Sequence, residues 1–165
     1  MLYFFANGPA PTTAAQAVVT TGTAIKTMLQ VKGVTAVTFK VIEWGISFDG
    51  SAAATPIKCE LLETGTVFAT VTAAVAADLP CLDPNGPTST TFFSVGTSAT
   101  GYTSTAEGTI TASRMFDAQL VAPTNQYVKQ FPLGREPIVN AVSALRIRVT
   151  AGAAVNAYCY VVLEV

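Results

Sequence analysis

The sequence contains no histidine in its 165 residues. Histidine is the commonest general base in enzymes, and the Ser-His and Cys-His pairs of hydrolases depend on it, so these classes are excluded. A glycosidase needs only two carboxylates about 5 to 9.5 Å apart, for which Glu43, Glu60 and Glu164 are formal candidates. Each is expected beside a lysine or arginine on the polar side of a strand, where ion pairs are ordinary. We therefore predict that the protein is not an enzyme and binds no cofactor.

Charged residues are also scarce, at 12% of the chain with a net charge of −1, against about 25% in ordinary soluble domains. The nine basic residues are spread thinly, so no nucleic-acid binding is expected. Three cysteines without C-x-x-C spacing predict neither a disulfide framework nor a zinc site, and Cys59 and Cys159 are expected in the core. No run approaches the ~20 apolar residues of a membrane span, and the N-terminal MLYFFANGPAP lacks the basic region of a signal peptide. The chain is therefore expected to stay in the compartment where it is made.

Threonine and valine are abundant, and apolar and polar residues alternate where charges occur, which is typical of β-strands. Strands are predicted at 23–32, 39–48, 57–63, 65–72, 108–112, 115–122, 127–133, 145–149 and 155–165. Short strands separated by Gly, Pro, Asn and Thr turns predict an all-β fold, an antiparallel two-sheet sandwich of the jelly-roll type. At this length the chain is expected to form one domain, 1–165.

The alternation also predicts which side chains face the core. In residues 39–48 the predicted core face is Ile42, Trp44, Ile46 and Phe48, and the predicted outer face is Phe39, Val41, Glu43 and Ser47. In the other strands the predicted core residues are Ile57, Cys59, Leu61, Leu145, Ile147, Val149 and alternate residues from Val155 to Val165, with Lys58, Glu60, Arg146 and Arg148 facing out. Phe39, Val41, Tyr158, Tyr160 and Val162 would then form an exposed apolar patch, which indicates either an interface or cover by loops or an N-terminal arm.

Two segments depart from the strand pattern. Residues 78–107 are predicted to form a long Ser/Thr/Gly-rich loop, and residues 1–22 an N-terminal arm, of which 12–19 could also be a helical turn. Ordering about 30 residues costs roughly 30 to 60 kcal/mol, which burial of a few large apolar side chains does not offset. We therefore expect the long loop to contain a short strand pair near 92–95, to become ordered against another chain, or both. Phe92, Phe93 and Tyr102 are the predicted partner contacts.

Two loop motifs have alternative interpretations. Asp83 and Asn85 place side-chain oxygens two residues apart, as calcium loops do, but the further ligands of an EF-hand are missing. The order Asp83-Pro84-Asn85-Gly86 fits a type I turn, which we predict instead. In FPLGREP, residues 131–137, Arg135 and Glu136 form either a binding pair or a solvated loop tip, and Arg135 is a further candidate partner contact.

This small, histidine-free chain, rich in Thr, Ala and Gly and predicted to form a β-sandwich, resembles the capsid decoration (cement) proteins of tailed bacteriophages. Three of its segments look similar to uncharacterised phage and prophage proteins of this length: TGTAIKTMLQVK (21–32), EWGISFDGSAAATPIKCELLETGT (43–66) and QFPLGREPIVNA (130–141). The likeness spans most of the chain and contains no catalytic or ligand motif. It implies a jelly-roll-like homo-oligomer, expected to be a trimer, that binds across major capsid protein subunits. The expected location is the outer surface of a virion assembled in the host cytoplasm, where the protein would stabilise the capsid.

The alternative prediction is a carbohydrate-binding module or lectin-like β-sandwich. In that case a sugar ring would stack on an aromatic side chain, for which Trp44, Tyr102 and Tyr127 are the candidates. Trp44 argues against this function because it lies on the most apolar predicted face.

Overall fold

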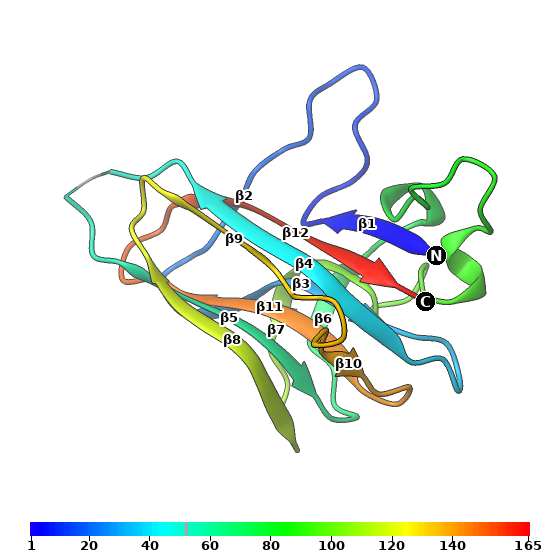
Figure 1. The fold of residues 1–165 in the computed structure, drawn as a ribbon. Helices are drawn as coiled ribbons and strands as arrows, with labels where there is room; N and C mark the ends of the chain where they lie inside the picture. Colours follow the sequence, from blue (N-terminus) through cyan, green and yellow to red (C-terminus); the bar gives the residue numbers. More distant parts are fainter. Residues whose placement is uncertain (52) are drawn as a thin grey trace.

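The computed structural model, which describes residues 1–51 and 53–165, is a sandwich of two antiparallel sheets (Figure 1). The first sheet has the order β1-β12-β4-β10, with β2 beside β12 and β9 beside β4; its strands are β1 (Leu2–Ala6), β2 (Val19–Thr20), β4 (Phe39–Phe48), β9 (Gln126–Gln130), β10 (Ile138–Val139) and β12 (Asn156–Glu164). The second sheet has the order β6-β7-β3-β11-β5-β8; its strands are β3 (Ile25–Lys32), β5 (Ile57–Thr64), β6 (Thr70–Ala73), β7 (Gly101–Ala106), β8 (Ser113–Val121) and β11 (Ala144–Thr150). The predicted all-β sandwich is confirmed, and its jelly-roll type stays a prediction.

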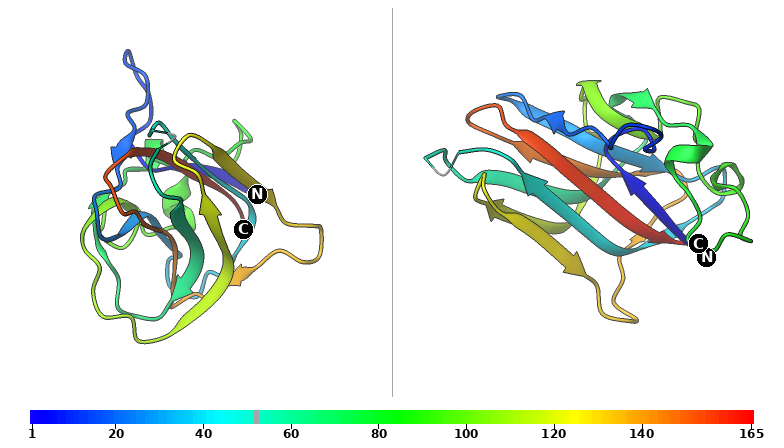
Figure 2. Two further views of the ribbon diagram at one scale, coloured as in Figure 1. Left: turned by 90° about the vertical axis from the view of Figure 1, so that its left-hand side faces the viewer. Right: turned by 90° about the horizontal axis from the view of Figure 1, so that it is seen from above.

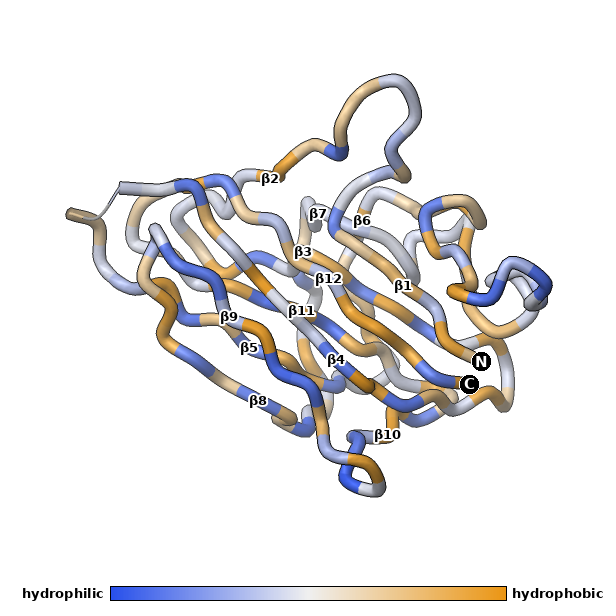
Figure 3. The backbone as a smooth tube through the Cα atoms, turned by 45° about the horizontal axis from the view of Figure 1, so that its top comes forward, coloured by the Kyte–Doolittle hydropathy of each residue, from blue (hydrophilic) through white to orange (hydrophobic). Residues whose placement is uncertain are grey.

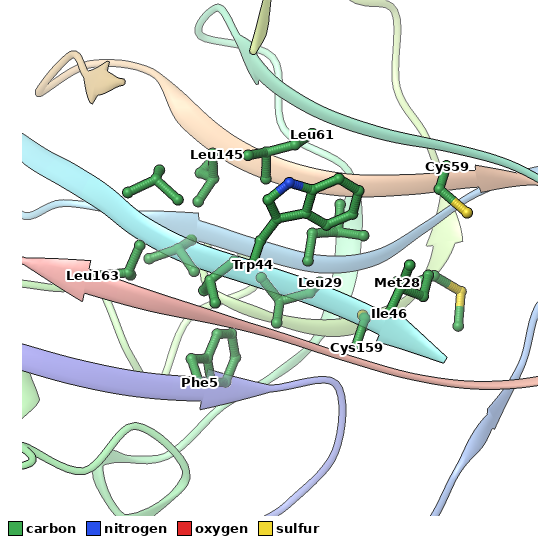
Figure 4. Close-up of a cluster of buried hydrophobic side chains, with 14 of the residues drawn as sticks. Phe5, Met28, Leu29, Trp44, Ile46, Cys59, Leu61, Leu145, Cys159 and Leu163 are labelled. Atoms are coloured by element: carbon green, nitrogen blue, oxygen red, sulfur yellow. The ribbon is translucent and has the colours of Figure 1, made fainter. Parts of the chain in front are cut away.

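The core lies between the two sheets, with Trp44 among the labelled side chains at its centre (Figure 4). Hydrophobic and hydrophilic positions alternate along the strands (Figure 3), as expected where one face is buried. The predicted core positions of β5, β11 and the middle of β12 are confirmed, since all of the following are buried: Ile57, Cys59, Leu61, Leu145, Ile147, Val149, Ala157, Cys159, Val161 and Leu163.

A β-bulge in β4 overturns part of the predicted facing of residues 39–48. Val162 of β12 lies opposite Glu43, whereas the next residue, Leu163, lies opposite Val41, so Ile42 is the extra residue. One extra residue reverses the facing of everything before it. Phe39 and Val41 are therefore buried in the core, and Ile42 faces out and is half-buried.

Two predicted strands, 65–72 and 108–112, are mostly connections that cross the outer face of the second sheet; only Thr70–Ala73 is a strand there. The connection 65–69 leads from β5 to β6 near the opposite edge of the sheet. On its way it accepts a hydrogen bond from Arg146 at the Val67 carbonyl (2.7 Å), and it exchanges two with the Gln30 amide at Ala69. Arg146 also donates to the carbonyl of Glu107, at the start of the connection 107–112 (3.0 Å). Arg146, predicted on a solvated face, is consequently buried.

The predicted long loop and N-terminal arm are both more ordered than expected. Residues 78–107 include the end of the 3₁₀ turn Ala76–Asp78, a second such turn at Ser89–Thr91, and strand β7, which pairs with β3 and β6. Of residues 1–22, the first six lead into and form β1 on β12, and only the loop between β1 and β2 extends from the body (Figure 1). Residues 12–18 contain no helical turn.

The two ends of the chain lie side by side (Figure 2). The amino group of Met1 donates to the carbonyl of Val165 at 2.7 Å. Within the described residues, no helix has the length and apolar character needed to cross a membrane.

Candidate functional site

The three carboxylates considered for a glycosidase are each engaged by other groups of the chain. Glu43 accepts a hydrogen bond from the Tyr160 hydroxyl at 2.6 Å. Glu164 lies 3.2 Å from the Lys40 ammonium. Glu60 is buried on the outer side of β5, 2.8 Å from Arg148 and 3.0 Å from Lys58. Burial raises the pKa of Glu60, but these two hydrogen-bonded partners outweigh it and the pKa lies below its usual value. All three carboxylates therefore have structural partners.

A fourth carboxylate, Asp117 of β8 in the second sheet, bonds to side chains of the first sheet and so connects the two sheets. It accepts hydrogen bonds from the indole nitrogen of Trp44 (3.1 Å) and the hydroxyl of Tyr127 (2.9 Å), both in the first sheet. Lys129 of β9 lies 3.3 Å from its other oxygen, which also accepts from Gln119 at 3.2 Å. Burial raises the pKa of Asp117, but these bonds outweigh it and the pKa lies below its usual value; burial and the same carboxylate raise the pKa of Tyr127 to about 12. No pattern in the sequence indicated this cluster, because Trp44 is 73 residues from Asp117 along the chain and the other members lie on two strands of different sheets.

A fifth carboxylate, Glu63 at the end of β5, is held in a similar way. It is buried, pairs with Arg114 of β8, and accepts a hydrogen bond from the backbone of Asn140 at 2.8 Å. Arg114 also donates to the Ile138 carbonyl at 2.8 Å. These contacts fasten β8 to the loop that follows β10, and they line an open polar hollow of about 330 Å³.

The four predicted partner contacts do not lie together. Phe93 is buried, and its ring packs edge-on against Phe39 (5.4 Å between centroids) and Tyr3 (5.3 Å), so it offers a partner no surface. Phe92 is half-buried against Tyr3, and Tyr102 is half-buried on β7 against the core. Arg135 is exposed in the loop between β9 and β10. For Phe92, Tyr102 and Arg135 a partner contact stays a prediction.

The aromatic residues considered for sugar stacking are mainly internal. Trp44 is fully buried, and Tyr127 packs against it with ring centroids 5.4 Å apart. The outer face of the first sheet instead carries Tyr160, whose ring lies over Gly45: a β-carbon on that glycine would come within 2.5 Å of the ring. Phe4 stacks on Tyr160 at 5.4 Å. The half-buried Tyr160 and Phe4 are therefore the stacked aromatic pair of that outer face.

Five large apolar side chains that are more than half exposed come from the strands and loop at one edge of the sandwich; those of β8 face the outer side of the second sheet, and those of β9 and β10 the outer side of the first. We call this set the apolar edge: Met115 and Leu120 of β8, Val128 of β9, Leu133 of the following loop, and Ile138 of β10. β8 is the last strand of its sheet, and among the strands that the structure describes β9 pairs with β4 alone. The apolar patch predicted from Phe39, Val41, Tyr158, Tyr160 and Val162 is wrong for Phe39 and Val41, which are buried, while the other three residues are half-buried.

The turn predicted at residues 83–86 is confirmed, since Gly86 donates to the Asp83 carbonyl and Asn85 to the Asp83 carboxylate, each at 2.9 Å. This turn borders a hollow of about 300 Å³, here called the Cys81 hollow, lined by Ala76, Leu79, Pro80, Cys81, Pro84 and Pro87 among others.

No family model, curated protein or solved structure matches this chain.

Proposed function

We propose that this protein is a structural, non-catalytic virion component that coats the outer surface of a bacteriophage capsid. Copies of the chain, joined as a homo-oligomer for which a trimer is the expected form, bind across neighbouring major capsid protein subunits. Such binding is possible only in the assembled shell, so its free energy adds to the stability of that state.

The apolar edge is the observation that carries this proposal. Leu120 is 73% exposed and Leu133 96% exposed, and the other three side chains are each more than half exposed. Of the charges beside them, Asp117 is paired with Lys129 and Glu63 with Arg114, whereas Arg135 has no ion-pair partner among the described residues. The centre of a protein interface is apolar and poor in unpaired charge, and a specific interface buries about 1,000 Å² or more. The edge has this composition.

The non-catalytic part rests on the carboxylates and on composition. Glu43, Glu60 and Glu164 have partners within the chain, and the sequence has no histidine to act as a general base. The resemblance of the composition and β-sandwich fold to capsid decoration proteins, with that of residues 21–32, 43–66 and 130–141 to phage and prophage proteins, supplies the choice of capsid as partner.

The test compares phage shells with and without the protein. Shells are heated, and genome release is followed with a nucleic-acid dye; shells that carry the protein are expected to release at a higher temperature. The double variant Met115→Glu/Leu120→Glu should restore less stability than the wild type. Thr124→Glu/Gln126→Glu, which adds the same charge at two exposed polar positions, one in the connection after β8 and one at the start of β9, is the matched control. Equal release temperatures with and without the protein would contradict the proposal.

Carbohydrate binding is a second candidate, favoured by the aromatic pair Phe4 and Tyr160. The ring of Tyr160 lies over Gly45, and its hydroxyl is fixed by Glu43, so an aromatic surface and a carboxylate lie side by side. A glycan array with the isolated protein tests it. Saturable binding that is lost in Tyr160→Ala and kept in Leu120→Ala would favour this function over the first.

A further inference from the structure

The loop between β9 and β10 presents a single, strongly exposed apolar side chain. Leu133 is 96% exposed. It sits in a tight turn closed by a hydrogen bond from the Arg135 amide to the Pro132 carbonyl (2.9 Å). We call residues 132–135 the Leu133 turn. In Figure 3 this loop, next to β10, carries hydrophobic and hydrophilic positions side by side.

The Leu133 turn is held in one conformation. Gly134 has a φ of +80°, which suits the third position of a type II turn, where glycine is favoured. The amide of Gly134 donates to the Glu136 carboxylate at 2.9 Å, and Pro132 and Pro137 restrict the backbone on both sides. A preorganised loop loses little conformational entropy when it binds, which favours its use as a contact.

The Cys81 hollow is an open, largely apolar recess on the surface. Its volume of about 300 Å³ is lined mainly by alanine, leucine and proline, with Leu79 buried within it. Leu82, next to it in sequence, is 54% exposed and extends the apolar surface. An aliphatic side chain is therefore the group that the hollow fits.

The charges beside the two features are opposite. Arg135, the last residue of the Leu133 turn, is exposed and has no ion-pair partner among the described residues. Asp83 lines the hollow and is exposed. Opposite charges at the rim of a contact fix its orientation and speed association.

The loop between β9 and β10 (orange) and residues 76–89 (green) lie apart in both views of Figure 2, so the partner of the Leu133 turn is sought in a second copy of the chain. We propose that Leu133 of one copy inserts into the Cys81 hollow of a second copy, with Arg135 beside the second copy's Asp83. Such a contact is head-to-tail, and it forms a closed ring when the rotation between copies allows it. In a ring every chain is held by two contacts, which raises the effective concentration at each. The inference rests on the homo-oligomer of the proposed function, but its test uses the isolated protein without capsids.

Disulfide trapping tests the contact directly. Leu133→Cys keeps the natural Cys81, while Cys59 and Cys159 are fully buried and cannot compete. Under mild oxidation the purified variant is expected to form covalent dimers and larger species on a non-reducing gel. Leu133→Cys/Cys81→Ser should form none, and Thr124→Cys, at another exposed turn, should form far fewer. No covalent species from Leu133→Cys, or species that persist without Cys81, would overturn the proposal.

A second measurement needs no cysteine. Native mass and sedimentation should show that Leu133→Asp raises the dissociation constant of the oligomer by about tenfold or more, because the turn is too exposed to affect folding. Leu133→Met should remain near the wild type. Arg135→Glu and Asp83→Lys should each weaken association, and the two together should recover it. A wild type that stays monomeric at high concentration, or a Leu133→Asp variant that associates as the wild type does, would overturn the proposal whatever happens with capsids.

Discussion

The outer face of the second sheet is covered by connections of the chain, whereas the apolar edge is exposed. Across β3 and β11 two connections cover the sheet, and Gln30 and Arg146 beneath them are fully buried and bonded to the connections. Along β8, β9 and β10 nothing in the described residues covers Leu120 or Leu133, which remain exposed. Connections of the chain cover the polar side chains Gln30 and Arg146, whereas the apolar side chains Leu120 and Leu133 are left exposed. The exposed apolar edge is therefore a specific feature of this sequence. This difference supports docking at the edge.

The largest expected loss of stability comes from removing Arg146, which binds the connections over the outer face of the second sheet. Arg146→Met leaves the carbonyls of Val67 and Glu107 without their donor beneath the connections, and each buried acceptor left unsatisfied costs about 1 to 3 kcal/mol, so the expected total is about 2 to 6 kcal/mol. Urea unfolding should show a lower midpoint with a loss of about that size. Arg135→Met, at an exposed site, is the control and should change stability by less than about 0.5 kcal/mol. If both variants unfold alike, the buried guanidinium does not hold the connections.

The next effect concerns the junction between the two regions. Asp117→Ala leaves the indole of Trp44 and the hydroxyl of Tyr127 without an acceptor, for an expected loss of about 2 to 4 kcal/mol. Because the folded pKa of Asp117 lies below its ordinary 3.8, its carboxylate stabilises the fold above that pH. This contribution disappears as the pH falls through the folded pKa. The midpoint temperature of thermal unfolding should therefore fall less steeply from pH 6 to pH 2 for Asp117→Asn than for the wild type. Parallel curves of midpoint against pH would count against this role.

A smaller effect is expected in alkali at the same junction. The pKa of Tyr127 rises from 10.0 to about 12 in the folded chain. A raised pKa gives stability that is fully present below pH 10 and lost as the pH rises towards 12. Tyr127→Phe should therefore lose less stability than the wild type between pH 10 and 12, as measured by chemical unfolding at fixed temperature. Tyr158→Phe, whose raised pKa has no carboxylate among its causes, is the comparison.

The smallest effect on folding is expected at the apolar edge itself. Met115→Glu/Leu120→Glu replaces two exposed side chains, so the free energy of unfolding should stay within about 0.5 kcal/mol of the wild type. Solubility should rise and shell binding should fall. A large loss of stability would mean that these side chains serve the fold, and the contrast between the two regions would disappear.

The strands with regular alternation could be predicted from sequence, and the departures from alternation could not. In β5, β11 and β12 polar and apolar residues alternate, so their facing was predicted correctly. In β4 the run from Phe39 to Ile42 is apolar or amphipathic throughout, and the bulge leaves no mark in it. Arg146 looked like a surface charge because the connection that buries it comes from about 80 residues away along the chain.

Predictability was similar for the candidate site. Proline and glycine in residues 131–137 indicated a loop, and Arg135 is at its tip, but the alternation could not indicate that Leu133 points to solvent. The joint contact of Trp44 and Tyr127 with Asp117 depends on how β8 and β9 meet across the two sheets. Such contacts arise from tertiary packing, which local periodicity does not encode.

The adjacency of Met1 and Val165 has a practical outcome for attachment. Peptides or domains fused to Met1 and to Val165 would extend from the same place on the sandwich, so a reporter and an affinity tag could be attached side by side. A short peptide bridge could also join the two residues, and fresh ends could be cut into the projecting loop between β1 and β2, giving a permuted chain whose two sheets are unchanged.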